Sequence, residues 1–132
     1  MPRNRKAVGA QGESTAAAFL ESRGYRLVDA NVRPEGGMAR GEIDLIAWHG
    51  EFLVFIEVKT RHAAWGAQGA PMEAVDARKR RQLLALAAAY LARHALDDVQ
   101  CRFDVVEIVE TKDGFARFRL LPDAFTAMDS AD

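Results

Sequence analysis

Apolar residues recur at helical spacing in two segments of this 132-residue chain. The first predicted helix runs from about Lys6 to Arg23, and Gly24 ends it in the position after the last helical residue. The second runs from about Ala77 to Ala95, with Asp76 as its N-cap. Its expected buried side consists of Leu83, Leu84, Leu86, Ala87, Tyr90, Leu91 and Ala95.

Five other segments have the short, β-branched and aromatic composition of strands. They are Tyr25–Val32, Glu42–Trp48, Phe52–Thr60, Cys101–Glu110 and Phe115–Leu121. A turn at Lys112–Gly114 joins the last two, and Pro122–Met128 is expected to form a short helix. The order α-β-β-β-α-β-β predicts an α/β fold, with helices covering a sheet, and a single domain spanning residues 1–132.

Every residue from Phe52 to Ile56 is apolar. A strand that is hydrophobic on both faces is typical of a covered position inside a sheet, whereas a solvated hairpin would alternate. The segment is therefore predicted to be a central strand, and the charged residues that follow it stand at the end of a buried element.

A two-residue loop at His49-Gly50 is expected to join this strand to the preceding one. Trp48 would then pair with Glu51, and Asp44 would lie opposite Phe55. Any loop with an even number of residues keeps the same side chains on the same face, whereas an odd number would not.

This register places Asp44, Glu57 and Lys59 on one face of the hairpin, because residues two apart share a face. The two carboxylates become diagonal neighbours, with Cα atoms roughly 7–8 Å apart, and can bind one hard cation together. The alternative is a solvated glutamate–lysine ion pair. Burial of the strand argues against it, because charges there are costly unless they are paired or bind metal.

The choice of lysine at position 59 is informative, because arginine outnumbers lysine by 14 to 4 in this chain. A compact ammonium group fits beside a metal-bound water and a phosphate oxygen better than a broad guanidinium does. Among the other polar residues, Glu42 is expected in a salt bridge at the rim of the sheet. Asp104 is expected to be a buried acid satisfied by an arginine or by backbone donors. The three histidines share no ligand-like spacing.

The composition limits the function classes. With 49% hydrophobic and 28% charged residues, the chain is typical of a globular protein. Cys101 is the only cysteine, which excludes a disulfide framework and suits a reducing cytoplasm. The longest apolar run, Leu83–Ala92, is shorter than the ~20 residues of a membrane span, and no secretory segment follows the basic start. We therefore expect a cytoplasmic protein with no membrane partner.

The formal net charge of −1 argues against passive coating of nucleic acid, but it allows a local basic patch beside an acidic site. Such a patch is predicted at the start of the second helix, at Arg78, Lys79, Arg80 and Arg81. Four cations there oppose the helix dipole, and a helix N-terminus with basic side chains is a natural phosphate site. We expect these residues, with Arg61, to contact nucleic acid.

Asp44, twelve intervening residues and Glu57-Val58-Lys59 resemble the signature of the PD-(D/E)XK nuclease superfamily. The wider pattern resembles the YraN-type bacterial proteins, which are described as predicted endonucleases related to archaeal Holliday-junction resolvases. The matching segments cover most of the chain. They are Gln11–Glu13, Gly24-Tyr25, Asn31–Arg33, Gly41–Ile46, Phe55–Arg61 and Arg102–Val106.

This resemblance implies a restriction-endonuclease-like three-layer core with a mixed central sheet. It implies that Asp44 and Glu57 bind Mg²⁺, or Mn²⁺, with help from the Val58 carbonyl, and that Glu13 on the first helix completes the site. Lys59 would orient the attacking water and stabilise the developing negative charge.

Two functions are therefore carried forward. The first is a metal-dependent endonuclease acting on nucleic acid, with DNA, including branched DNA, preferred over RNA. The alternative is a non-catalytic nucleic-acid binding module on the same fold. Two close carboxylates favour the enzyme, because a pure binder gains nothing from anions that repel phosphate. Cleavage of both strands would favour a homodimer.

Overall fold

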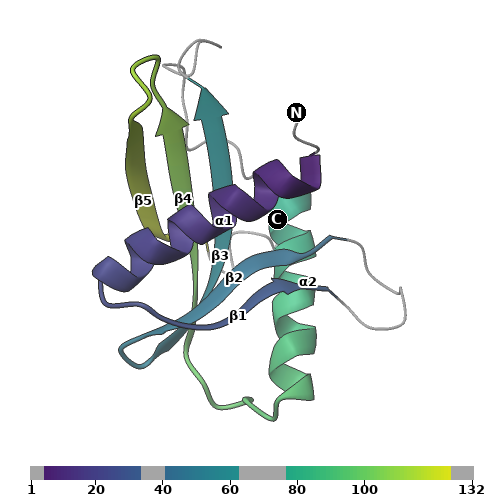
Figure 1. Ribbon diagram of the computed structural model, residues 1–132. Coiled ribbons are helices and arrows are strands. Elements are labelled where there is room, and N and C mark those ends of the chain that lie inside the picture. Colours follow the sequence, from purple (N-terminus) through teal and green to yellow (C-terminus); the bar gives the residue numbers. More distant parts are fainter. Residues whose placement is uncertain (1–4, 34–40, 63–76, 126–132) are drawn as a thin grey trace.

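The computed structural model describes residues 5–33, 41–62 and 77–125, and side chains within 14–33, 41–61 and 77–124. The elements are α1 (Arg5–Ser22), β1 (Arg26–Val32), β2 (Ile43–His49), β3 (Phe52–His62), α2 (Ala77–Arg93), β4 (Cys101–Glu110) and β5 (Ala116–Phe125). The predicted α/β class and the order α-β-β-β-α-β-β are confirmed (Figure 1). Neither of the two helices in these ranges is long and apolar enough to cross a membrane.

The five strands form one mixed sheet in the order β1-β2-β3-β4-β5. All neighbours are antiparallel except β3 and β4, which run parallel. Parallel neighbours cannot be joined by a tight turn, so the chain leaves the sheet after β3 and returns through α2. The strand predicted to be central, β3, is the middle strand, and residues 53–57 within it are buried.

Each face of the sheet is covered by one helix, which gives three layers. Ala16 and Leu20 of α1 pack on one face against a cluster that includes Val54 and Ile56 of β3. On the opposite face, Leu83, Leu86, Ala87 and Tyr90 of α2 pack against a cluster that includes Phe55. Consecutive residues of β3 thus enter opposite cores, as strand alternation requires.

Two predictions at the ends of elements are wrong. The segment Pro122–Phe125 continues β5 and is not helical, while residues 126–128 lie outside the described residues. The extension depends on a tertiary contact, because the Asp123 N–H donates to the buried Asp104 carboxylate at 2.8 Å. Pro122 is tolerated because β5 is an edge strand, with a register irregularity between Phe103 and Val105.

The second error concerns α2, which ends at Arg93. Ala95, expected on the buried side, is exposed and has a φ of 54°. Its predicted N-cap, Asp76, lies outside the described residues. The rest of the predicted buried side is confirmed, with Leu84 and Leu91 partly buried at its margin.

The loop that joins β2 and β3 lies one residue later in the chain than predicted. His49 pairs with Phe52, so the two-residue loop is Gly50-Glu51. Gly50 takes a φ of 61° as the first central residue of the turn, a position that favours glycine. Phe55 therefore pairs with Ile46 and not with Asp44 as predicted, and the pairing between the two strands ends at Leu45 and Ile56.

Candidate functional site

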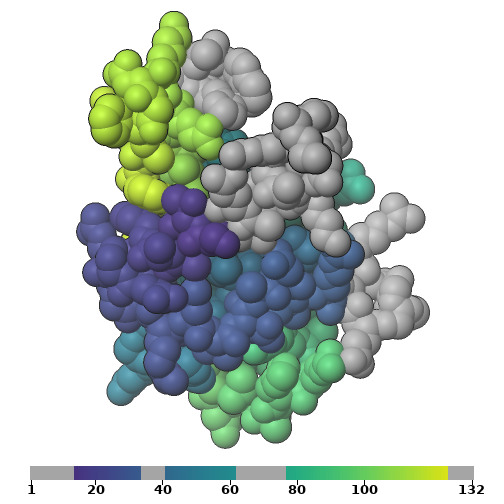
Figure 2. All heavy atoms as spheres, in the orientation of Figure 1, coloured from purple at the N-terminus to yellow at the C-terminus, as the bar shows by residue number. Residues whose placement is uncertain are grey.

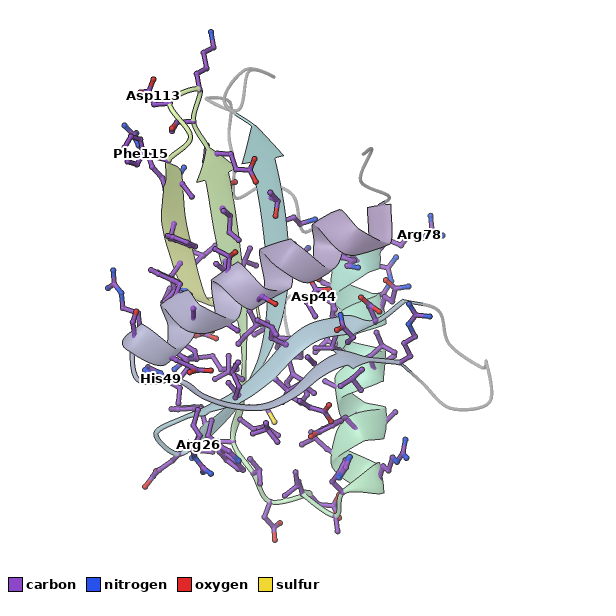
Figure 3. The ribbon with its side chains drawn as sticks, in the orientation of Figure 1. Arg26, Asp44, His49, Arg78, Asp113 and Phe115 are labelled. Atoms are coloured by element: carbon purple, nitrogen blue, oxygen red, sulfur yellow. The ribbon has the colours of Figure 1, made fainter. Side chains whose placement is uncertain are left out.

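Asp44 reaches β3 through a hydrogen bond to the backbone. Its Oδ2 accepts the Val58 N–H at 2.8 Å, and the side chain is half-buried. Strict alternation does not apply here, because Ile43 and Ile46 both pack in the α2-side core. The hydrogen bond to Val58 therefore brings the Asp44 carboxylate next to the Glu57–Lys59 segment (Figure 3).

Glu57 is one of the most buried carboxylates in the described part of the chain. Its side chain is 9% exposed, and Phe55, two residues earlier on the same face, packs against Tyr90 of α2. The Oε2 atom of Glu57 is buried and has no hydrogen-bond partner among the described residues. An unsatisfied buried carboxylate oxygen is costly, because it has lost its water without gaining a donor.

Two lysines lie beside the other carboxylate oxygen. Lys59 Nζ is 3.7 Å and Lys79 Nζ is 3.8 Å from Glu57 Oε1. Lys59 follows Glu57 on the same face of β3, whereas Lys79 comes from the first turn of α2. Both lysines are partly exposed, at 26% and 31%, so each ammonium group can also meet a ligand from solvent.

Burial raises the pKa of the Glu57 carboxyl, and this effect exceeds the lowering by the positive charges of Lys79 and Lys59. The nearby negative charge of Glu42 adds to the rise. Desolvation disfavours a charged carboxylate, and a bound cation would favour it. A bound metal ion would therefore stabilise the charged form of Glu57, which burial disfavours.

Glu42 itself forms the rim salt bridge that was expected. Its Oε2 accepts from Arg33 Nε at 3.0 Å, and its Oε1 accepts from Asn31 at 3.3 Å.

The described side chains contain no group of three or more aspartate, glutamate, histidine or cysteine residues able to hold a metal ion. Asp44 is hydrogen-bonded to the backbone of Val58, the residue that follows Glu57. The third predicted acid, Glu13, lies in α1, but its side chain is outside the described residues. Its role and that of the Val58 carbonyl stay predictions.

The four residues of the predicted basic patch at the start of α2 have different environments. Lys79 turns toward Glu57, Arg80 is half-buried, and Arg78 and Arg81 are exposed. Arg78 and Arg81 therefore remain the members best placed for an external ligand, and Figure 3 shows Arg78 at the surface. Lys79 was predicted as part of this patch, but its position beside Glu57 was not predicted. The signal was available, because the argument from lysine in an arginine-rich chain applies to position 79 as well.

Charged residues of β4 and β5 lie beside Lys59 across the sheet. Lys59 of β3 pairs with Glu107 of β4, which pairs with Arg119 of β5. Glu107 is fully buried, with Arg61 Nε at 3.3 Å and Arg119 Nη1 at 3.8 Å from its two oxygens. Glu107 and Arg119 were not predicted as part of this site, because the approach of Glu107 to Lys59 and Arg61 depends on the parallel pairing of β3 with β4.

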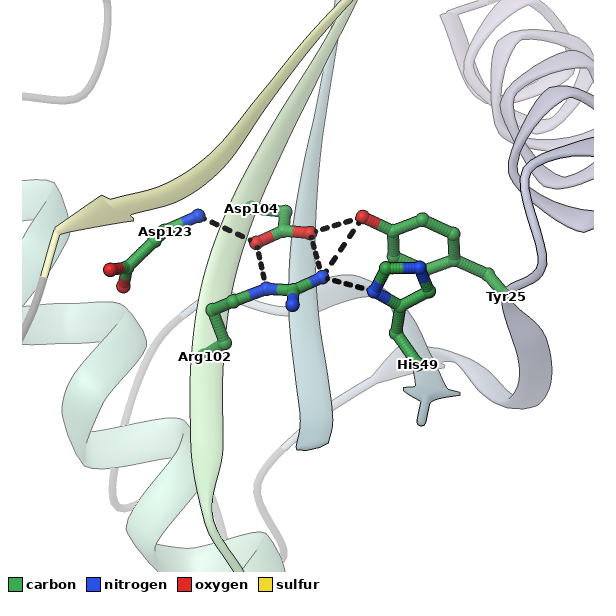
Figure 4. Close-up of polar contacts among 5 residues, drawn as sticks. All are labelled: Tyr25, His49, Arg102, Asp104 and Asp123. Carbon is green, nitrogen blue, oxygen red and sulfur yellow. Dashed lines mark hydrogen bonds and ion pairs between the residues drawn. The ribbon is translucent and has the colours of Figure 1, made fainter. Parts of the chain in front are cut away.

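Asp104 is satisfied as expected and belongs to a structural cluster (Figure 4). It accepts from Arg102 at 2.9 and 3.0 Å, from Tyr25 at 2.6 Å and from the Asp123 N–H. Arg102 also lies 2.9 Å from His49 Nδ1, and the His49 ring stacks on Tyr25. Every Asp104 oxygen has a partner, in contrast to Glu57, so this cluster joins Tyr25, which precedes β1, to β2, β4 and β5 without an open ligand position.

The architecture and the hairpin together define a class. This is a three-layer α/β protein with a mixed five-stranded sheet, and its central hairpin carries Glu57 and Lys59 side by side, with Asp44 hydrogen-bonded to the N–H of Val58 between them. The chain belongs to the family described as "Uncharacterised protein family UPF0102", whose model matches residues 12–108. This confirms the resemblance to YraN-type proteins.

Several curated relatives support this membership over nearly the whole chain. The UPF0102 protein STH1475 of Symbiobacterium thermophilum is 50% identical, over 91% of this chain and 97% of its own length. GSU0650 of Geobacter sulfurreducens is 41% identical, over 92% and 91%. A UPF0102 protein of Moorella thermoacetica is also 41% identical, over 95% and 100%.

Proposed function

We propose that this protein is a Mg²⁺-dependent endonuclease that hydrolyses phosphodiester bonds in nucleic acid, with DNA as the first substrate to test. The single observation that supports this most strongly is the buried Oε2 of Glu57, which has no hydrogen-bond partner among the described residues and belongs to the residue before Val58, whose N–H donates to Asp44. The buried Glu107 also has oxygens without a hydrogen-bond partner, so the argument for Glu57 rests on this oxygen together with the two lysines beside its carboxylate and the Asp44 bond to the next residue, Val58.

The donor set fits a hard divalent cation. Mg²⁺ and Mn²⁺ prefer oxygen ligands, and Mg²⁺ is commonly bound by one or two carboxylates together with substrate phosphate. Asp44 and Glu57 would provide the carboxylates, with the Val58 carbonyl and Glu13 as the further ligands that the family resemblance implies. The raised pKa of Glu57 agrees with this assignment, because a cation would offset the cost of the buried charge.

The two lysines suit the substrate. When a metal ion is bound, it would activate a water molecule and neutralise charge on the phosphate. Lys59 and Lys79 would bind phosphate oxygens from the sheet and from the helix, and Lys59 would stabilise the negative charge that develops as water attacks. Both are flexible and about a quarter to a third exposed, so they can move from Glu57 to a phosphate.

Nucleic acid is the favoured phosphodiester because cations continue on both sides of the site. Arg78 and Arg81 extend it along α2, and Arg61 extends it along β3. Phosphate contacts of this kind position a nucleic acid without reading its sequence. The net charge of −1 agrees with local contacts at a site and not with general coating.

The test is a cleavage assay on branched, duplex and single-stranded DNA and on RNA, with Mg²⁺ or Mn²⁺ and with EDTA as the control. We expect cleavage that EDTA abolishes. Asp44→Ala should stop cleavage and leave binding equal or tighter, because it removes an anion facing an anionic backbone. Lys59→Ala should lose cleavage and some binding. A protein that binds these substrates but never cuts them would be the non-catalytic module, and the enzyme would be excluded.

A further inference from the structure

Two arginines of β5 lie on the same side of the sheet as the candidate site. Arg119 pairs with Glu107, and Arg117 pairs with Val109. The alternate residues of β5, Phe118 and Leu120, pack against the α1-side core. Because side chains alternate along a strand, Arg117 and Arg119 project from the opposite face, which also bears Glu57, Lys59 and Arg61.

Glu107 lies between two of the arginines on this face and fixes their positions. Its fully buried carboxylate lies between Arg61 of β3 and Arg119 of β5. Burial makes the negative charge dependent on these two guanidinium groups, which are thereby fixed near one another. Arg119 is nevertheless 54% exposed, so its guanidinium can contact an anion in solvent while it faces Glu107. The result is a preformed line of cations that leads from Lys59 across β4 to the edge of the sheet.

An exposed aromatic ring, Phe115, stands in the turn of the β4–β5 hairpin, two residues before Arg117. Phe115 is 73% exposed, more than any other large hydrophobic residue in the described ranges. Its backbone is held on both sides, because the Phe115 carbonyl accepts from the Thr111 N–H at 2.7 Å and its N–H donates to Thr111 Oγ1 at 3.2 Å. The hairpin projects from the body (Figure 2), and the Phe115 side chain is directed outward (Figure 3).

A ring held at this position by a fixed backbone, at the end of a row of arginines, matches the chemistry of a single-stranded nucleic acid. Cations track the phosphates, and an aromatic face stacks on an unpaired base whatever its identity. A regular duplex offers no free base face to such a ring. Of the acids near these arginines, Glu107 is buried and Glu110 pairs with Ala116 on the α1 side. Asp113 is exposed in the turn itself.

Resting on the proposed function, we infer that the β4–β5 hairpin binds a single-stranded segment of the substrate next to the cleavage site. Phosphates would lie along Arg61, Arg119 and Arg117, and an unstacked base would lie on Phe115. The substrate would then combine a single-stranded part with the position that is cut, as splayed or branched nucleic acids do.

The experiment measures binding of the full-length protein to a fluorescein-labelled single-stranded oligodeoxynucleotide and to its duplex, by anisotropy in EDTA. Phe115→Ala should weaken single-strand binding about 5- to 150-fold and leave duplex binding unchanged. Phe115→Leu, which keeps an apolar side chain, should show the same loss. Arg117→Gln with Arg119→Gln should lower the salt slope for the single strand by about 0.7 for each phosphate that is no longer neutralised. Val28→Ala and Arg26→Gln, exposed changes on β1, are the matched controls and should change neither quantity.

Unchanged single-strand affinity in the Phe115 variants, or equal losses for single strand and duplex, would overturn the inference. So would an unchanged salt slope, or self-association of the wild-type protein that Phe115→Ala abolishes, which would make the ring a contact between copies. These binding measurements are made in EDTA, without a divalent metal ion. A failure of cleavage would therefore count against the proposed endonuclease alone, whereas these outcomes would count against the hairpin alone.

Discussion

Lys79, in the first turn of α2, lies 3.8 Å from the Glu57 carboxylate near the end of the central strand β3. This contact joins two layers of the fold at the candidate site. It gives the buried Glu57 a positive partner from the helix in addition to Lys59 from its own strand. The helix start thus influences the protonation of a residue that lies 22 positions earlier in the chain.

Replacing Lys79 with glutamine should raise the pKa of Glu57 further. The positive charge of Lys79 is the largest influence that lowers this pKa, after burial has raised it. The pKa can be followed by NMR of the glutamate side-chain carboxyl carbon. Lys112→Gln, in the exposed turn between β4 and β5, is the control and should leave Glu57 unchanged. An unaffected Glu57 in Lys79→Gln would mean that the two groups do not interact in solution.

Glu57→Gln should stabilise the metal-free protein at neutral pH. A carboxyl whose folded pKa is raised contributes stability that is present below its unfolded pKa, near 4.3, and is lost as the pH rises through the folded value. Wild type and variant should therefore have similar stability in acid, and wild type should fall below the variant toward neutrality. Urea unfolding over this pH range measures the difference. Glu51→Gln, in the exposed hairpin turn, should show no such divergence.

Neutralising the exposed arginines of α2 should weaken nucleic-acid binding through its salt dependence. Arg78→Gln with Arg81→Gln should lower the slope of log affinity against log salt by about 1.4 to 1.8, on the expectation of 0.7 to 0.9 for each phosphate that an arginine neutralises. The fold should survive, because both side chains are exposed. Arg26→Gln on β1 is the control. An equal slope in wild type and the double variant would show that these arginines only face solvent.

Tyr25 should give the protein a loss of stability in alkali. Burial, together with the hydrogen bond to Asp104 and its negative charge, raises the pKa of the Tyr25 phenol well above its usual value. Stability from this group is fully present below the unfolded pKa, near 10, and is lost as the pH rises above it. Tyr25→Phe should cost about 1.5–3 kcal/mol at neutral pH and should lose less stability between neutral and alkaline pH. Chemical unfolding at both pH values tests this, and equal losses in the two proteins would contradict it.

Local patterns were sufficient to predict most of the fold. The apolar run before Glu57 predicted the central strand, and helical spacing predicted the face of α2 that packs on it. The hairpin register was wrong because the loop begins at Gly50, whose positive φ suits the first position of the turn. Pro122–Phe125 was wrong because its strand structure depends on Asp104, a residue of another strand.

The site was predictable only in part, because some of its contacts depend on tertiary packing. Glu57 and Lys59 share a face through simple alternation, and their proximity was expected. The approach of Lys79 depends on how α2 packs, and the approach of Glu107 to Arg61 depends on the parallel pairing of β3 with β4. Such contacts join distant parts of the chain, and spacing along the sequence does not contain them.

The most direct test of the central claim, that Asp44 and Glu57 form a divalent metal site, is a Mn²⁺ titration followed by electron paramagnetic resonance. Wild type should bind Mn²⁺ at neutral pH and bind it more weakly as the pH falls toward the raised pKa of Glu57. Asp44→Asn and Glu57→Gln should each lose this binding. Glu42→Gln, which removes a nearby rim acid, should keep it. Equal Mn²⁺ binding by wild type, Asp44→Asn and Glu57→Gln, or no binding by any of them, would contradict the account.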